Sequence, residues 1–230
     1  MEILRNFAVL EGPDGSGTTT QLNTLDSFFH PQISEREALF VAESSNSYFP
    51  TTGTRLPTLY KTFEPTSGII GKLIRQGLGK EANLSPETIA YLFAADRNEH
   101  IHGPDGVAER CKRGELVVSD RYLLSSLVYQ GITCGEELPF RLNRDFPSPE
   151  LLIYLDIEPE IAQKRISKRE NLEIYENLSF QNKVRERYKT LLPLFEREGI
   201  IVEIIDASTP PMDVAVKVWS AIQKMSIFKG

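Results

Sequence analysis

The segment 12–19 combines the residue types and the spacing of a loop that binds phosphate. It reads Gly-Pro-Asp-Gly-Ser-Gly-Thr-Thr and joins an apolar run to a helical pattern. Glycines allow successive backbone N–H groups to face one anion, and the start of the following helix adds its positive dipole end. We therefore expect this loop to hold nucleotide phosphates, although a tight strand-to-helix turn without a ligand is the simpler alternative. The expected contacts are Gly12, Asp14, Gly15, Ser16, Gly17, Thr18 and Thr19.

Two positions of this loop bear on metal binding and on charge. Thr19 supplies the hydroxyl that helps to hold Mg²⁺ in such loops. Thr18 stands where the pattern has Lys, whose ammonium reaches the β- and γ-phosphates. Losing one donor to a transition state typically costs ~10²–10³ in rate, so fast phosphoryl transfer needs a cation from elsewhere. The candidate replacements are Lys61, Lys72, Arg165, Lys168 and Arg169.

A second group lies at the end of a valine-rich run, where Asp120 is followed by Arg121. At the carboxyl end of a parallel strand, a carboxylate faces the crevice beyond the sheet. There Asp120 could hold Mg²⁺ or its water shell, and Arg121 would point near the same place. The alternative is that Asp120 only caps the next helix.

A third group places Phe93 and Arg97 one turn apart on the same face of a predicted helix. An aromatic ring and a guanidinium at this spacing suit a base and its phosphate. The alternatives are that Phe93 belongs to the core and that Arg97 pairs with Asp96 or Glu99 on a solvated face.

These groups need strands that end at one edge of a sheet and helices that cover it. Short apolar runs at 7–10, 58–63, 116–119, 151–156 and 200–206 predict five strands, with the weakest signal at 58–63. The last three runs are rich in Val, Ile and Leu without strict alternation, which is typical of strands buried in a parallel sheet. Helical patterns lie at 18–29, 69–78, 86–111, 158–169, 178–198 and 212–225. Gly103-Pro104 predicts a break, and Pro193 predicts a kink or an end. The alternation predicts an α/β fold, a doubly wound parallel sheet of five strands with helices on both faces.

The composition suits one α/β domain over residues 1–230, with an irregular insertion or long loop at about 32–57. The formal net charge of −6 argues against nucleic acid as a partner. An export signal and a run long enough to span a membrane are both missing, so we expect a cytoplasmic protein without a membrane partner. Cys111 and Cys134 are expected to be reduced thiols, and His100 and His102 are weak evidence for a metal.

Taken together, the motifs resemble those of the thymidylate kinase family and follow that family's order over most of the chain. The blocks that carry the resemblance are Leu10-Glu-Gly-Pro-Asp-Gly-Ser-Gly, Phe63-Glu-Pro-Thr, Ile70-Gly-Lys-Leu-Ile-Arg75, Leu92-Phe-Ala-Ala-Asp-Arg97, Ser119-Asp-Arg-Tyr122, Tyr129-Gln-Gly131 and Pro149-Glu-Leu-Leu-Ile-Tyr-Leu-Asp156. Each block alone is a weak signal, whereas their shared order is specific.

The resemblance implies a P-loop NTPase fold with a helical lid at about 164–179. It implies phosphoryl transfer from ATP, with Mg²⁺, to dTMP, in a protein that forms homodimers. Phe93 would stack on thymine, while Arg97 and Arg121 would bind the monophosphate. The other expected substrate contacts are Phe63, Glu64, Pro65, Arg75, Ser126 and Tyr129. The expected catalytic residues are Asp14, Arg97, Arg121, Arg165 and Arg169, of which the last two belong to the lid.

The chain departs from the family's pattern at three positions. Besides Thr18 in the loop, Ile174 stands at a lid position that often has Arg, and Phe63 stands where many bacterial members have Arg. These changes leave two alternatives to an efficient dTMP kinase. One is a slow or non-catalytic nucleotide-binding homologue, and the other is a kinase for another pyrimidine nucleotide or a deoxynucleoside.

Overall fold

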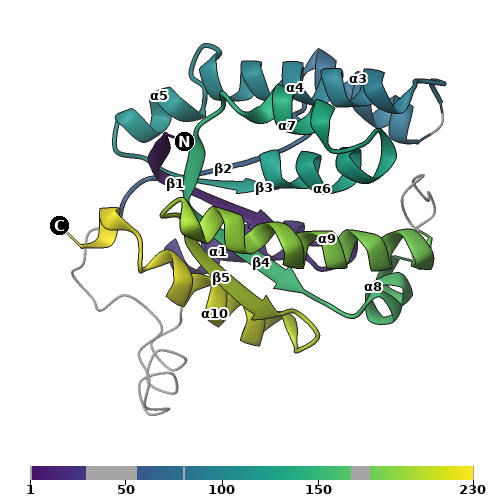
Figure 1. Ribbon diagram of the computed structural model, residues 1–230. Helices are drawn as coiled ribbons and strands as arrows, with labels where there is room; N and C mark the ends of the chain where they lie inside the picture. The colour runs from purple at the N-terminus through teal and green to yellow at the C-terminus, as the bar shows by residue number, and fades with distance from the viewer. Residues whose placement is uncertain (1, 30–55, 80, 167–176, 230) are drawn as a thin grey trace.

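The computed structural model describes residues 2–29, 56–79, 81–166 and 177–229. These residues form one parallel sheet in the order β2-β3-β1-β4-β5 (Figure 1). The strands are β1 (Ile3–Glu11), β2 (Leu59–Phe63), β3 (Leu116–Asp120), β4 (Ser148–Asp156) and β5 (Ile201–Asp206). The predicted α/β fold class is confirmed, with β1 and β4 beginning earlier than their apolar runs do.

The helices follow the predicted patterns closely where those patterns are amphipathic. They are α1 (Thr18–Phe29), α3 (Ile69–Leu78), α4 (Pro86–His102), α5 (Val107–Lys112), α6 (Leu123–Thr133), α7 (Glu137–Asn143), α8 (Pro159–Ile166), α9 (Leu178–Arg197) and α10 (Pro211–Ile222), with a 3-10 turn at Ser226–Phe228. The break at Gly103-Pro104 is confirmed. Pro193 does not end α9, which continues to Arg197.

Two helices, α6 and α7, were not predicted from the sequence. Nearly every residue of α6 from Leu123 to Gly131 is buried, so its apolar residues follow no single helical stripe. α7 is only seven residues long, which is too short for a clear period. Both helices matter for the site, because α6 follows directly on the Asp120–Arg121 pair.

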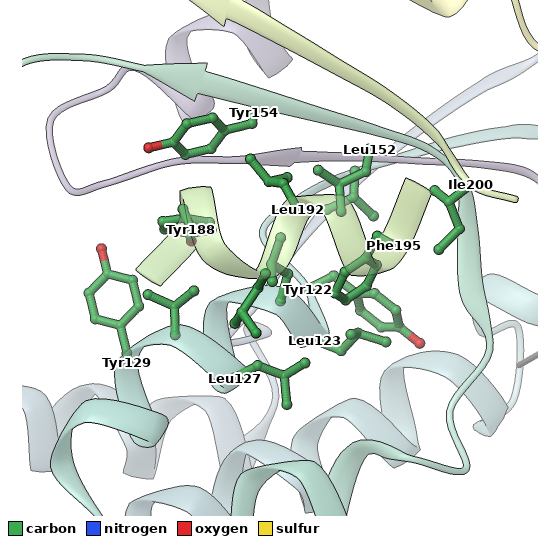
Figure 2. Close-up of a cluster of buried hydrophobic side chains, with 14 of the residues drawn as sticks. Tyr122, Leu123, Leu127, Tyr129, Leu152, Tyr154, Tyr188, Leu192, Phe195 and Ile200 are labelled. Carbon is green, nitrogen blue, oxygen red and sulfur yellow. The ribbon is translucent and has the colours of Figure 1, made fainter. Parts of the chain in front are cut away.

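Apolar side chains fill both faces of the sheet. Helices α1 and α10 pack on one face, where Phe28 stacks on Trp219 at 5.5 Å between ring centroids. Helices α3, α4, α5, α6 and α9 supply the other core. Figure 2 shows this second core, in which side chains of α9 meet those of β4 and α6. Tyr154 and Tyr188, for example, have ring centroids 4.9 Å apart.

The predicted chemical groups gather at the carboxyl edge of the sheet. The phosphate loop follows β1, Glu64 and Pro65 follow β2, and Asp120 ends β3. Because β1 lies between β3 and β4, this edge contains the point where the strand order reverses, and ligands of doubly wound folds bind there.

Several expectations fall outside the residues that the structure describes. They are Lys168, Arg169, Ile174, most of the lid at 164–179 and most of the insertion at 32–57. Among the described helices, none is long and apolar enough to cross a membrane.

Candidate active site

A cavity of about 550 Å³ opens at the carboxyl edge, a size typical of sites for small ligands. It runs from the phosphate loop and α1 to the turn after β2, to α4 and to α6. The predicted site residues that line it are Asp14, Gly15, Gly17, Thr18, Thr19, Phe63, Glu64, Pro65, Arg75, Phe93, Arg97, Asp120, Arg121, Ser126 and Tyr129. Gly12, Ser16 and Arg165 do not line it.

Glycine is required in the phosphate loop by backbone geometry and by space. Gly15 has φ +85° and Gly17 has φ +98°, both in the left-handed region that favours glycine. A Cβ on Gly15 would lie 2.7 Å from the carbonyl oxygen of Ala162 in α8. A Cβ on Gly12 would lie 2.4 Å from Oγ of Ser16. The loop is therefore tightly curled and pressed against α8, as a phosphate cradle requires.

Two guanidinium groups of the described chain contact this loop, whereas Thr18 supplies no charge. Arg121 donates from Nη1 to the carbonyl of Gly12 at 2.9 Å. Arg165, exposed on α8, donates to the carbonyls of Gly15 at 3.4 Å and Ala207 at 2.9 Å. Of the other candidate replacements, Lys61 instead forms an ion pair with Asp26 at 2.5 Å.

Thr19 and Asp120 meet as the metal prediction requires. The Thr19 hydroxyl donates to Oδ2 of Asp120 at 2.5 Å. The other carboxylate oxygen, Oδ1, is buried without a hydrogen-bond partner among the described residues. Carboxylate and hydroxyl oxygens are ligands that Mg²⁺ accepts, so this pair fits the ion. The alternative that Asp120 caps the next helix is wrong. The residue at the N-terminal cap of α6 is Tyr122, and neither carboxylate oxygen of Asp120 accepts a hydrogen bond from a backbone N–H of that helix.

Arg97 is buried in a cage of polar groups and is 1% exposed. Its Nε and Nη2 donate to Oε2 of Glu64 at 3.0 and 2.6 Å. Nη2 also donates to Ser126 Oγ at 3.1 Å, and Nη1 donates to Asn143 Oδ1. Pairing with Asp96 on a solvated face is therefore wrong. Glu64 orients an arginine that also lines the cavity.

Asp96 has a different role, which is to hold the turn after β2. Its carboxylate accepts from the N–H and the hydroxyl of Thr66, both at 2.7 Å. Arg75 holds the same turn by donating to the carbonyls of Pro65 at 2.9 Å and Thr66 at 2.8 Å. Its Cζ lies 5.9 Å from the ring centroid of Phe63. Arg75 thus shapes the cavity wall as well as lining it.

Arg121 lies at the junction of the phosphate loop and the rest of the cavity. Its Nη2 pairs with Oδ1 of Asp14 at 2.6 Å. Its Cζ lies 5.4 Å from the centroid of the Tyr129 ring. Phe93 of α4 both lines the cavity and packs against the core, so the two interpretations of Phe93 are compatible.

The structure adds polar residues that the sequence patterns did not single out as site residues. Gln181, in the first turns of α9, donates to Oδ2 of Asp14 at 3.0 Å. Gln130 lines the cavity next to Tyr129, and Asn143 of α7 accepts from Arg97. Ser125 and Glu11 lie behind Arg121. Only Gln130, Ser125 and Glu11 fall in or beside motif blocks, whereas Gln181 and Asn143 reach the site through the packing of helices.

A five-stranded parallel sheet in the order β2-β3-β1-β4-β5, with a glycine-rich loop between β1 and α1, fits the P-loop class of α/β proteins. A sequence profile described as Thymidylate kinase matches residues 49–218. The chain belongs to the thymidylate kinase family, whose reaction is phosphoryl transfer to dTMP.

Individual relatives match the chain over most of its length, and the first of those below covers nearly all of it. The chain is 37% identical over 224 residues to a probable thymidylate kinase of Pyrobaculum aerophilum, covering 97% of this chain and 99% of the relative. It is 39% identical to a putative thymidylate kinase of Treponema pallidum, covering 83% and 81%. It is 40% identical to a putative thymidylate kinase of Aeropyrum pernix, covering 85% and 83%.

Proposed function

We propose that this chain transfers the γ-phosphate of ATP to dTMP and releases ADP and dTDP, acting as one domain over residues 1–230. The observation that carries this proposal is that one cavity joins the phosphate loop to Arg97, Arg121 and the aromatic side chains of Phe93 and Tyr129. An acceptor phosphate is already anionic, so the reaction needs positioning and charge more than it needs a general base.

The donor side is the loop 12–19 and the start of α1. Backbone N–H groups of the loop would bind the ATP phosphates, with Asp14 fixing Arg121 beside them. Thr19 and Asp120 would hold Mg²⁺, which neutralises charge on the transferring phosphoryl group when bound. Their oxygens already lie within hydrogen-bonding distance of one another, which supports this assignment.

The acceptor side is the part of the cavity between α4 and α6. Arg97 and Arg121 would bind the monophosphate, and Phe93 would stack on thymine. Ser126 and Tyr129 complete the nucleoside pocket, with Phe63, Glu64, Pro65 and Arg75 forming the wall after β2. Glu64 contributes by orienting Arg97 rather than by contacting the nucleotide.

Arg165 is the cation that would replace the Lys missing at position 18. The structure describes three of the candidate replacements, Lys61, Lys72 and Arg165. Among these, Arg165 donates a hydrogen bond to the backbone of the phosphate loop. Its two present acceptors are neutral carbonyl oxygens. Charged phosphate oxygens form stronger hydrogen bonds with a guanidinium and would therefore replace them. Arg169 would assist from the lid. Homodimers stay a prediction from the resemblance, and a cytoplasmic location stays a prediction from the sequence.

The test is ADP release from Mg²⁺-ATP with dTMP, with UMP and with no acceptor, beside calorimetric titration of each nucleotide. We expect turnover that depends on dTMP and is weaker with UMP. Thr18 favours a second candidate, a nucleotide-binding protein without catalysis. Binding of dTMP without turnover would establish that second candidate, and preferred turnover of UMP would assign another acceptor.

A further inference from the structure

Glu11, the last residue of β1, has a fully buried carboxylate that four donors approach. Oε1 accepts from the backbone N–H groups of Tyr122 at 3.0 Å and Ser125 at 3.2 Å. Oε2 accepts from the Ser125 hydroxyl at 2.6 Å and the Tyr188 hydroxyl at 2.9 Å. A buried carboxylate persists only when it is paired or hydrogen-bonded, and here every donor belongs to α6, to its start or to α9.

The first two of these bonds make Glu11 the cap of α6. The first N–H groups of a helix have no partner within the helix, and side-chain oxygens usually satisfy them. Tyr122, which precedes α6, provides no such oxygen. Glu11 supplies it from the end of β1, and when ionised its negative charge faces the positive end of the helix dipole.

The same carboxylate also helps to fix Arg121, the residue that precedes Tyr122 in the chain. Arg121 has φ +70°, a conformation that non-glycine residues rarely adopt and that surrounding contacts must maintain. Its N–H donates to the carbonyl of Leu10 at 2.8 Å, and its carbonyl accepts from Ser119 at 2.7 Å. On the other side, Tyr122 is held by Glu11.

The side chain of Arg121 is tied to the same group. Its Nη1 donates to Oγ of Ser125 at 3.2 Å, and that hydroxyl donates to Glu11. The Ser125 hydroxyl is therefore hydrogen-bonded to both groups and links the orientation of the guanidinium to the position of the carboxylate. Tyr188 joins α9 to this chain of hydrogen bonds, and Figure 2 shows its side chain between those of Tyr154 and Tyr129.

We propose that Glu11 is a positioning residue that holds Arg121 in the conformation needed to bind the acceptor phosphate. This inference rests on the proposed function, in which Arg121 contacts the monophosphate of dTMP. It assigns Glu11 no contact with substrate, because its carboxylate is covered by α6 and Tyr188.

A double-mutant cycle separates this role from a general structural one. The dissociation constant for dTMP is measured by calorimetry for the wild type, Glu11→Gln, Arg121→Ala and the double variant. Bonds to charged groups are worth enough that Arg121→Ala should weaken dTMP about 10- to 100-fold. Glu11→Gln should weaken it about 10-fold alone and less than about 2-fold when Arg121 is already absent, because groups acting through one another are not additive.

Glu150→Gln is the matched control. Glu150 also accepts from two backbone N–H groups and a hydroxyl, those of Asn6 and Ser226, but it does not line the cavity. It should leave dTMP affinity unchanged. If Glu11→Gln does not fold, Ser125→Ala takes its place in the cycle, since it removes the hydroxyl between the carboxylate and Arg121.

The outcomes separate the two proposals. If the wild type does not bind dTMP, the proposed function fails. If dTMP binds and Arg121→Ala weakens it, while Glu11→Gln and Ser125→Ala have no effect or an equal effect in both backgrounds, only the role of Glu11 is overturned.

Discussion

At the residue scale, the arginines that line the cavity are already held by the protein. Arg97 is surrounded by Glu64, Ser126 and Asn143, and Arg121 is paired with Asp14. Fixed donors lose little freedom when a phosphate arrives, and such preorganisation is the main means of stabilising charge in phosphoryl transfer. Arg165 differs from these two arginines, because within the described residues its guanidinium donates to the backbone carbonyls of Gly15 and Ala207 and to no carboxylate.

The role of Arg165 predicts a rescue experiment. Arg165→Ala should lower kcat about 10²–10³-fold, the usual loss for one transition-state donor. Adding Thr18→Lys to that variant should recover a large part of the loss, because it returns a cation to the loop. Steady-state assays of ADP release measure both effects. Lys217→Ala, which removes an exposed charge of α10, serves as the control. An unchanged kcat in Arg165→Ala would show that the charge comes from elsewhere.

At the element scale, three segments meet at Glu11: the end of β1, the start of α6 and the side of α9. Burial raises the pKa of this carboxyl to about 7, although hydrogen bonds from Ser125 and Tyr188 and the nearby charge of Arg121 oppose the rise. Arg121 and Tyr188 are the titratable groups that face it, and one belongs to the turn before α6 and the other to α9. The junction between these elements therefore responds to pH.

This junction predicts how stability changes with pH. The ordinary pKa is 4.5 and the folded one about 7, so between these values the unfolded chain loses a proton that the folded chain keeps. The contribution of Glu11 to the free energy of unfolding should be greatest below pH 4.5 and fall as pH rises towards 7. Relative to Glu11→Gln, the loss should be on the order of 3 kcal/mol. Urea unfolding at several pH values checks this, and a constant difference between the two proteins from pH 4.5 to 8 would contradict it.

At the scale of the whole molecule, the cavity is shared by elements that are distant in the sequence. The loop after β1, the turn after β2, α4 and α6 each contribute a wall. A ligand that spans these walls binds the folded protein and has no equivalent site in the unfolded chain. Binding is therefore linked to global stability by mass action.

This linkage predicts thermal stabilisation by the acceptor. At about 100 times its dissociation constant, dTMP should stabilise the fold by ~2.7 kcal/mol. For a chain of this length, that corresponds to a rise in Tm of roughly 5–10 °C. Thermal melts with dTMP and with equal UMP measure it, and UMP should give a smaller rise. Equal shifts with both nucleotides would contradict a preference for thymine.

The sequence by itself determined the class of fold and the location of the chemistry. Buried parallel strands are apolar on both faces, and amphipathic helices repeat with a fixed period, so strands such as β3 and β4 and helices such as α1 and α3 could be predicted locally. Glycine spacing marked the phosphate loop for the same reason, since backbone curvature is a local property.

Only the tertiary structure decided which groups hold one another. The partner of Arg97 is Glu64 rather than its neighbour Asp96, the cap of α6 is Glu11 from β1, and Gln181 comes from α9. These contacts join residues far apart in the chain, and they depend on strand order and helix packing. A helix buried on all sides, such as α6, also has no periodic pattern to reveal it. Burial then makes each of these polar partners necessary, because an unsatisfied charge inside the protein is far more costly than one in water.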